Sequence, residues 1–233
     1  YRTNFQSRIF EDLLLKVKIP YVIIGGVSFY QRREIKDILS LLRIVLAGSD
    51  GIAFARTVNI PKRGLGEKAV EKIREAAGGM TLLDFCTAVV DRKVEFKLSP
   101  KQMEGLRNYV NLILGLKEMA HQNVSLQTLV SEAIERSRYE EYLKEDPETF
   151  AERRENIAEL ITKAAEWEQE NPSGTLAAFL EELTLKTSED AKEPLADSVK
   201  LMTLHNGKGL EFSVVFLVGM EEDLFPHVNS RES

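Results

Sequence analysis

The sequence predicts a mixed fold, in which an α/β unit built from both ends of the chain is interrupted by an all-α insertion. Short β-rich apolar runs occur only near the ends, at residues 21–24 and 199–204. Between them, apolar residues recur three and four positions apart, the spacing of amphipathic helices. We therefore expect residues 1–49 and 196–233 to form one α/β unit and residues 50–195 to form a helical insertion.

The first part should contain a helix, a strand and a second helix. Apolar residues at helical spacing predict a helix over Phe5–Val17, capped by Asn4. Tyr21–Ile24 is a short apolar run that the two following glycines end, which is typical of a buried strand and a turn. The next periodic segment predicts a helix over Arg33–Leu46.

The middle and last parts follow from the same periodicity. Glycine and proline clusters separate the predicted helices of the insertion, which cover Glu67–Ala77, Leu82–Val90, Lys101–Ala120, Leu126–Arg138, Pro147–Glu170 and Thr175–Leu185. Strand character returns at Val199–Leu204. A further apolar run, Ser213–Val218, predicts a strand buried on both faces of a parallel sheet.

Composition excludes several classes of protein. No apolar run approaches the roughly 18 residues that span a bilayer, so a membrane protein is not expected. Cys86 is the only cysteine and lies in an apolar helical segment, which predicts a core residue and no internal disulfide. The three histidines lack metal-ligand spacing, so no metal site is expected. We expect a reducing, cytoplasmic setting.

The net charge of −6 conceals a basic segment. Residues 56–74 hold six basic and two acidic residues, a local charge of +4. Within this segment Gly64-Leu65-Gly66 opens a predicted helix, so that backbone N–H groups can approach a phosphate while Lys62, Arg63 and Lys68 supply positive charge. This pattern is typical of the hairpin of a helix-hairpin-helix, which contacts duplex DNA through its backbone. The alternative is an ordinary glycine-rich turn with solvated charges.

A second polar cluster, Thr203–Phe212, follows the predicted strand at 199–204. Ligands of open α/β folds bind at the carboxyl ends of strands, so this loop could hold a phosphate, a ribose or a nucleic-acid backbone. It is not a phosphate-binding loop of the Walker A type, because Lys208 is followed by glycine rather than serine or threonine. The alternative is a plain connection with surface charges.

Six segments along the chain resemble superfamily 1 DNA helicases of the UvrD, PcrA and Rep type, and one of them is Ile19-Pro20-Tyr21 with Gly25-Gly26. Thr203–Phe212 resembles their motif V, and the hairpin resembles their Gly-Ile-Gly element, with Leu65 in place of isoleucine. Asn206-Gly207 stands where the family more often has small residues, and the glycine adds backbone freedom. The other matching segments are Tyr1–Arg8, Phe29–Asp37 and Gly219–His227.

The resemblance implies that the α/β unit is part of the RecA-like subdomain 2A and that the insertion is subdomain 2B. It also implies three groups of site residues. Single-strand contacts would come from Arg8, Thr203, His205 and His227. Glu211 would bind the ribose of ATP, with Lys208 near the nucleotide. Duplex contacts would come from Lys62, Arg63, Gly64, Leu65, Gly66 and Lys68.

The same resemblance implies a 3′→5′ DNA helicase of repair or replication that uses ATP and Mg²⁺. The sequence has neither a Walker A pattern nor an Asp-Glu dipeptide, and it ends before the family's motif VI. We therefore expect an excised 2A/2B fragment without ATPase activity of its own. Its expected partners are DNA, the 1A and 1B motor domains and repair proteins. Two alternatives are a helical protein-interaction adaptor and part of an AddA or RecB-type helicase-nuclease.

Overall fold

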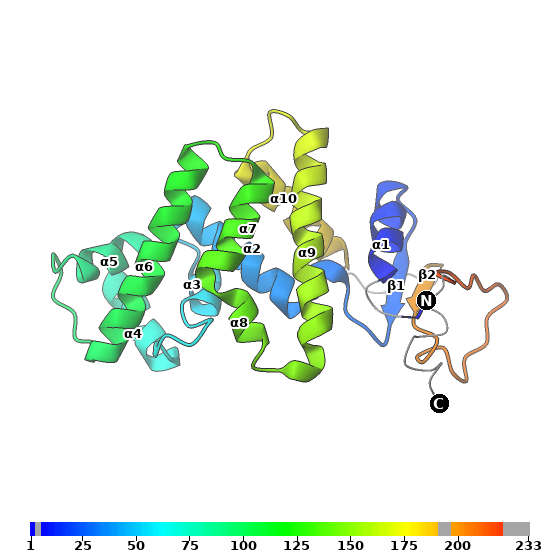
Figure 1. Ribbon diagram of the computed structural model, residues 1–233, viewed down its shortest axis with the longest axis horizontal. Helices are drawn as coiled ribbons and strands as arrows, with labels where there is room; N and C mark the ends of the chain where they lie inside the picture. Colours follow the sequence, from blue (N-terminus) through cyan, green and yellow to red (C-terminus); the bar gives the residue numbers. More distant parts are fainter. Residues whose placement is uncertain (3–5, 191–196, 221–233) are drawn as a thin grey trace. The chain divides into compact units, whose positions relative to one another are not determined.

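The structure, a computed structural model, describes residues 1–2, 6–190 and 197–220 (Figure 1). The predicted cap Asn4 and the predicted DNA contact His227 lie outside these residues. Contacts divide the chain into two compact units, one made of residues 1–32 and 183–233 and the other of residues 33–182. The predicted division into residues 1–49, 50–195 and 196–233 stays a prediction.

The first unit contains the two strands, β1 (Tyr21–Ile24) and β2 (Val199–Met202), with α1 (Ser7–Lys16) and the short 3₁₀ helix η2 (Phe29–Gln31). The strands pair in parallel, with Tyr21 opposite Val199 and Ile24 opposite Met202. The parallel sheet expected of the α/β unit is therefore confirmed, with one strand from each end of the chain. Both strands run in the same direction, so their carboxyl ends lie at one edge of the sheet.

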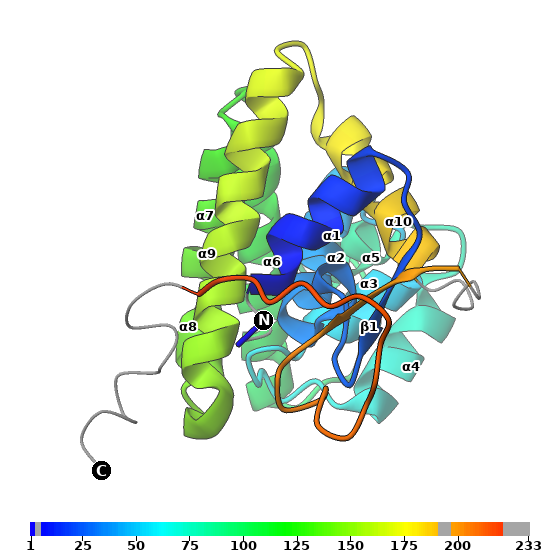
Figure 2. The same cartoon turned by 90° about the vertical axis from the view of Figure 1, so that its right-hand side faces the viewer.

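The predicted strand at Ser213–Val218 is wrong. Figure 2 shows this segment, in red, as an irregular trace. Its apolar side chains are exposed, at 70% for Val214, 69% for Val215 and 82% for Phe216. A strand needs a neighbour that accepts and donates its backbone hydrogen bonds. Among the described residues the sheet consists of β1 and β2 only, so this apolar run pairs with neither strand.

The second unit is helical. Six of its helices were predicted in the correct places from periodicity, but two short ones, α3 and α8, were not, since five to seven residues show too little of a helical period. In chain order the helices are α2 (Arg33–Ala47), α3 (Gly51–Thr57), α4 (Glu67–Ala77), α5 (Leu82–Val90), α6 (Pro100–His121), α7 (Leu126–Ser137), α8 (Tyr139–Leu143) and α9 (Pro147–Glu170), and α10 (Leu176–Asp190) begins in this unit.

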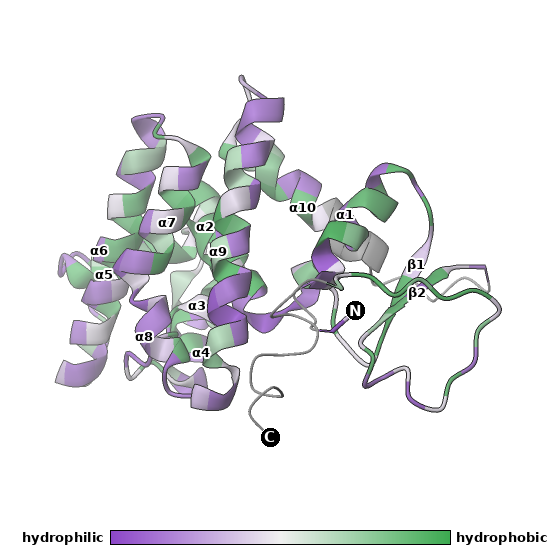
Figure 3. Cartoon of the chain, turned by 45° about the vertical axis from the view of Figure 1, so that its right-hand side comes forward, coloured by the Kyte–Doolittle hydropathy of each residue, from purple (hydrophilic) through white to green (hydrophobic). Residues whose placement is uncertain are grey.

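Helix α2 is central to the core of the helical unit, because it packs against α3, α6, α7 and α9. Its residues Ile35, Ile38, Leu42 and Ile44 are at most 1% exposed. Figure 3 shows hydrophobic and hydrophilic stripes alternating around these helices, the pattern expected of amphipathic helices around a core. Cys86 is fully buried, as predicted. Among the described helices, none is long and apolar enough to cross a membrane.

Candidate nucleic-acid interface

The predicted hairpin, Asn59–Gly66, lies between α3 and α4. Asp50 caps the first of these helices, since its Oδ1 accepts hydrogen bonds from the backbone N–H groups of Ile52 (3.0 Å) and Ala53 (2.9 Å). Gly66 is the N-cap of α4. The local architecture is therefore helix, hairpin, helix, with α3 supplying the first helix that periodicity did not detect.

Asn59 fixes the turn of the hairpin. Its side-chain Oδ1 accepts hydrogen bonds from the backbone N–H of Arg63 at 2.7 Å and of Leu65 at 3.1 Å. Between them Gly64 has φ +77°, a conformation that favours glycine. The Leu65 side chain is only 1% exposed, so it anchors the turn in the core. Any duplex contact of Leu65 would have to use its backbone.

Arg63 lies on the inner side of the hairpin. Its guanidinium lies 5.5 Å from the ring centroid of Tyr109. Burial lowers the pKa of Arg63, and the neighbouring Tyr109 partly offsets this effect. The Arg63 Nη1 donates to four backbone carbonyl oxygens, those of Thr57 (3.2 Å), Val58 (3.3 Å), Ile60 (2.8 Å) and Pro61 (3.2 Å). The structure therefore gives Arg63 partners within the hairpin, and its duplex contact stays a prediction.

Three lysines carry the exposed positive charge of this region. Lys62 and Lys68 are exposed, and Lys62 Nζ lies 3.1 Å from Glu145 Oε2 in an exposed ion pair. The third is Lys101 on α6, whose Cγ is 3.5 Å from the position that a Cβ on Gly64 would occupy. The sequence analysis missed Lys101, because no local pattern links a residue of α6 to the hairpin.

The N-terminus of α4 adds a further feature suited to an anion. The first N–H groups of a helix have no intrahelical acceptor, and the helix dipole makes this end positive. Gly66 has no side chain to cap them. Lys62 precedes this helix end and Lys68 lies in its first turn, so phosphate oxygens could meet both backbone donors and ammonium groups there.

The second candidate site, the loop Thr203–Phe212, follows β2 at the carboxyl ends of the parallel strands. Asn206 ties it to the end of β1, since its Nδ2 donates to the carbonyl oxygens of Ile24 (3.3 Å) and Gly25 (3.2 Å). The Asn206 backbone N–H also donates to Thr203 Oγ1 at 3.2 Å. The extra freedom expected of Asn206-Gly207 is therefore opposed by three hydrogen bonds from Asn206.

The remaining predicted residues of the first unit differ in exposure. His205, Lys208 and Glu211 are exposed and lie in or just after the loop, whereas Thr203 is buried. Arg8 on α1 is 4% exposed, with its Cζ 4.7 Å from the ring centroid of Phe29. The structure thus brings Thr203, His205, Lys208 and Glu211 onto one loop and places Arg8 in a buried cluster.

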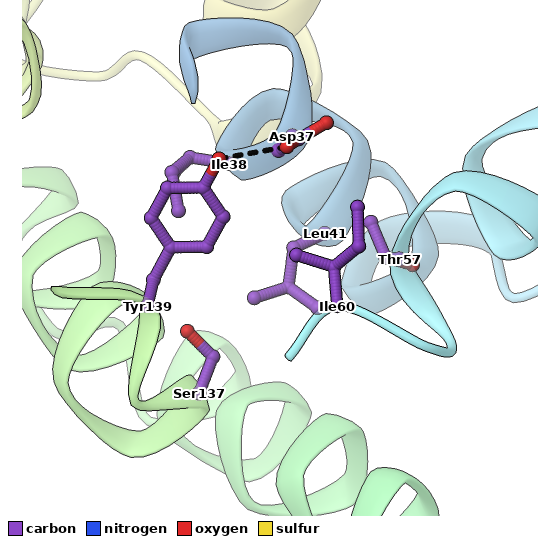
Figure 4. Close-up of a pocket in the computed structure, with 7 residues that line it drawn as sticks. All are labelled: Asp37, Ile38, Leu41, Thr57, Ile60, Ser137 and Tyr139. Carbon is purple, nitrogen blue, oxygen red and sulfur yellow. Dashed lines mark hydrogen bonds between the residues drawn. The ribbon is translucent and has the colours of Figure 1, made fainter. Parts of the chain in front are cut away.

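A small pocket in the helical unit is shown in Figure 4. Its polar centre is Asp37, whose Oδ2 accepts the hydroxyl of Tyr139 at 2.7 Å and whose Oδ1 lies 2.8 Å from Arg56 Nη1. The carboxylate is therefore satisfied by protein groups. Its volume of about 10 Å³ has room for one water at most, so the pocket is too small for a small-molecule ligand. Within the part of the chain that the structure describes, no acidic, histidine or cysteine cluster could hold a metal ion.

Comparison with known proteins gives matches along the whole chain. The UvrD-like helicase C-terminal domain family matches residues 1–233. The chain is 42% identical to the ATP-dependent DNA helicase PcrA of Bacillus subtilis over 99% of its own length, and 37% identical to the PcrA proteins of Staphylococcus aureus and Staphylococcus epidermidis over 100%. It spans 32% of the length of each of these relatives. The chain belongs to the UvrD-like helicase C-terminal domain family.

Proposed function

We propose that this chain forms part of subdomain 2A and all of subdomain 2B of an ATP-dependent DNA helicase and that its helical unit binds duplex DNA. Relatives that match the whole chain are named ATP-dependent DNA helicases, which favours this function over a protein-interaction adaptor. In this proposal residues 1–49 and 196–233 belong to 2A and residues 50–195 to 2B. The complete protein would unwind DNA 3′→5′ in the cytoplasm, in repair or replication.

The observation that best supports a duplex contact is that internal hydrogen bonds hold the backbone of the hairpin in place. Asn59 and Arg63 fix its backbone from within, so that it need not be ordered by a ligand. Lys62 and Lys68 remain exposed beside the positive end of α4. Such a surface would hold phosphates through backbone N–H groups and lysines, without reading the base sequence. We assign the duplex contact to Lys62, Lys68 and the backbone of Gly64–Gly66.

The loop Thr203–Phe212 would contact the single strand and the nucleotide. By family resemblance, Thr203 and His205 contact the single-strand backbone together with Arg8 and His227. Glu211 would accept hydrogen bonds from the ribose hydroxyls, as carboxylates do, and Lys208 would lie near the nucleotide. ATP and Mg²⁺ would bind in the complete protein, where the 1A and 1B domains supply the phosphate-binding loop.

The test is fluorescence anisotropy of the 233-residue chain with a labelled DNA hairpin carrying a 3′ single-stranded tail. Lys62→Glu should weaken binding and lower the salt dependence by about one unit of slope, the value for one lost phosphate contact. Lys93→Glu is the matched control, because Lys93 is exposed to a similar degree and pairs with Asp91 at 2.9 Å much as Lys62 pairs with Glu145.

The two variants separate a local contact from a general charge effect. Equal losses in both would show that the chain attracts DNA only through its overall charge. Unchanged binding in Lys62→Glu would refute the duplex assignment. A loss confined to Lys62→Glu, repeated in Lys68→Glu, would support it.

A further inference from the structure

The hairpin meets helix α6 at an unusually close backbone contact. A Cβ atom placed on Gly105 would lie 1.9 Å from the carbonyl oxygen of Arg63 and 2.9 Å from its carbonyl carbon. Real Cβ atoms do not approach other heavy atoms to within 3.0 Å. The backbone of Arg63 therefore occupies the space that any other side chain at position 105 would need.

The second glycine of α6 provides an internal comparison. A Cβ on Gly115 would meet only the Nη1 of Arg136, at 3.3 Å, which is the end of a flexible side chain. Glycine within a helix costs about 1 kcal/mol relative to alanine at either position. The helix gains nothing from Gly105, so the reason for glycine there lies in the hairpin that rests on it.

The same stretch of hairpin is held from other sides as well. Asn59 Oδ1 accepts the N–H of Arg63, whose carbonyl faces Gly105. Lys101 lies four residues before Gly105, on the same face of α6, and its side-chain carbons run beside Gly64. The peptide from Arg63 to Gly64 is thus clamped between Asn59 and helix α6.

We infer that Gly105 and Asn59 are positioning residues that set how the hairpin presents its backbone to a DNA phosphate. This inference rests on the proposed duplex contact of the hairpin. An alanine at position 105 would push the Arg63 carbonyl away by about 1 Å, from 1.9 Å to at least 3.0 Å. That shift would strain the Asn59 hydrogen bonds and move the N–H groups around Gly64 relative to Lys62 and Lys101.

The test compares Gly105→Ala with Gly115→Ala in the 233-residue chain, using the tailed DNA hairpin at several salt concentrations. Gly105→Ala should bind about tenfold more weakly, the effect of losing one charge-assisted hydrogen bond to a phosphate, and should show a shallower salt slope. Gly115→Ala should bind as the natural chain does. Fluorescence of Trp167, the one tryptophan, checks that the helical unit is folded in both.

A second variant covers the case in which Gly105→Ala does not fold. Asn59→Ala removes the shared acceptor without adding bulk. It should weaken binding to a similar degree and speed hydrogen exchange at the amides of Arg63 and Leu65, while amides of α9 exchange as before. Natural affinity in this variant, despite faster exchange at these amides, would overturn the inference.

The Lys62→Glu variant distinguishes a failure of the positioning role from a failure of the duplex contact itself. If Lys62→Glu weakens binding while folded Gly105→Ala and Asn59→Ala bind normally, the hairpin contacts DNA but needs no such positioning, and only the inference fails. If Lys62→Glu also binds normally, the duplex assignment fails and the inference fails with it. Losses in all three, with Gly115→Ala unaffected, would establish the positioning role.

Discussion

The half-buried Arg63, whose guanidinium has partners within the protein, leads to a prediction that separates a structural role from direct contact with DNA. Replacing Arg63 with alanine removes the donor that serves four carbonyl oxygens at 2.8–3.3 Å and the contact with the Tyr109 ring. Lys62 is its neighbour in sequence but is exposed, with one exposed ion pair to Glu145. Replacing Arg63 should therefore mainly lower the stability of the helical unit, whereas replacing Lys62 should mainly weaken DNA binding.

The magnitude follows from these contacts. Nη1 carries two hydrogens, so it makes about two full hydrogen bonds, each worth about 1.5 kcal/mol at the low end for a charged donor. The cation–π contact with Tyr109 adds little to this magnitude, because water can replace part of it. Arg63→Ala should thus lower the free energy of unfolding by about 3 kcal/mol. Lys62→Ala should lower it by about 0.5 kcal/mol, as is typical of exposed ion pairs.

Thermal unfolding followed by Trp167 fluorescence is the suitable assay, because this tryptophan lies in the helical unit and is 7% exposed. For a unit of this size, about 3 kcal/mol corresponds to a fall in Tm of about 6–12 °C. Arg107→Ala, which removes an exposed arginine of α6, is the control and should change Tm by less than about 2 °C. An unchanged Tm in Arg63→Ala, together with lost DNA binding, would refute the reasoning and return Arg63 to the DNA contact.

Three further predictions concern Tyr139, Cys86 and Asn206. Tyr139→Phe removes the hydroxyl that donates to buried Asp37. It should lower the free energy of unfolding by about 1–3 kcal/mol, measured by urea denaturation. An unchanged free energy would mean that water replaces the hydroxyl. Burial raises the pKa of the Cys86 thiol from 9.0 to about 12, so the folded state keeps a proton that the unfolded chain loses. The stability that the protonated thiol contributes is therefore complete below pH 9 and should decline by about 1.4 kcal/mol per pH unit above it. Urea denaturation of the natural chain and of Cys86→Ala at pH 8 to 10 would detect this decline. An equal change of the urea midpoint with pH in the two proteins would contradict it. Asn206→Ala should speed hydrogen exchange in residues 203–210 and leave α5 unchanged, and equal exchange in the loop would show that Asn206 does not restrain it.

Local signals were sufficient for most helices. Ser99 and Gln102 form a capping box at the start of α6, which begins at Pro100, one residue before the predicted start at Lys101. Leu82–Val90 was predicted with the bounds that α5 has in the structure. These signals act over one or two turns, so they can be read without knowing the fold. The short helices α3 and α8 extend over too few residues to show a period.

The strand at Ser213–Val218 failed for a different reason. An apolar, β-branched run expresses a preference for extended backbone, but a strand forms only beside another strand. Val199–Met202 has β1 as its partner, whereas Val214 and Phe216 are exposed. The sequence alone could not tell these two runs apart.

By itself, the sequence determined the family, the helical character of the middle of the chain and the position of the hairpin, because motifs and periodicity are local. The tertiary structure alone decided what the hairpin residues do. It placed carbonyl oxygens around Arg63, brought Lys101 beside Gly64 and set Gly105 against the Arg63 backbone. The sequence could not show these contacts, because they join residues of α6 to a loop that precedes α4, and only packing defines which groups become neighbours.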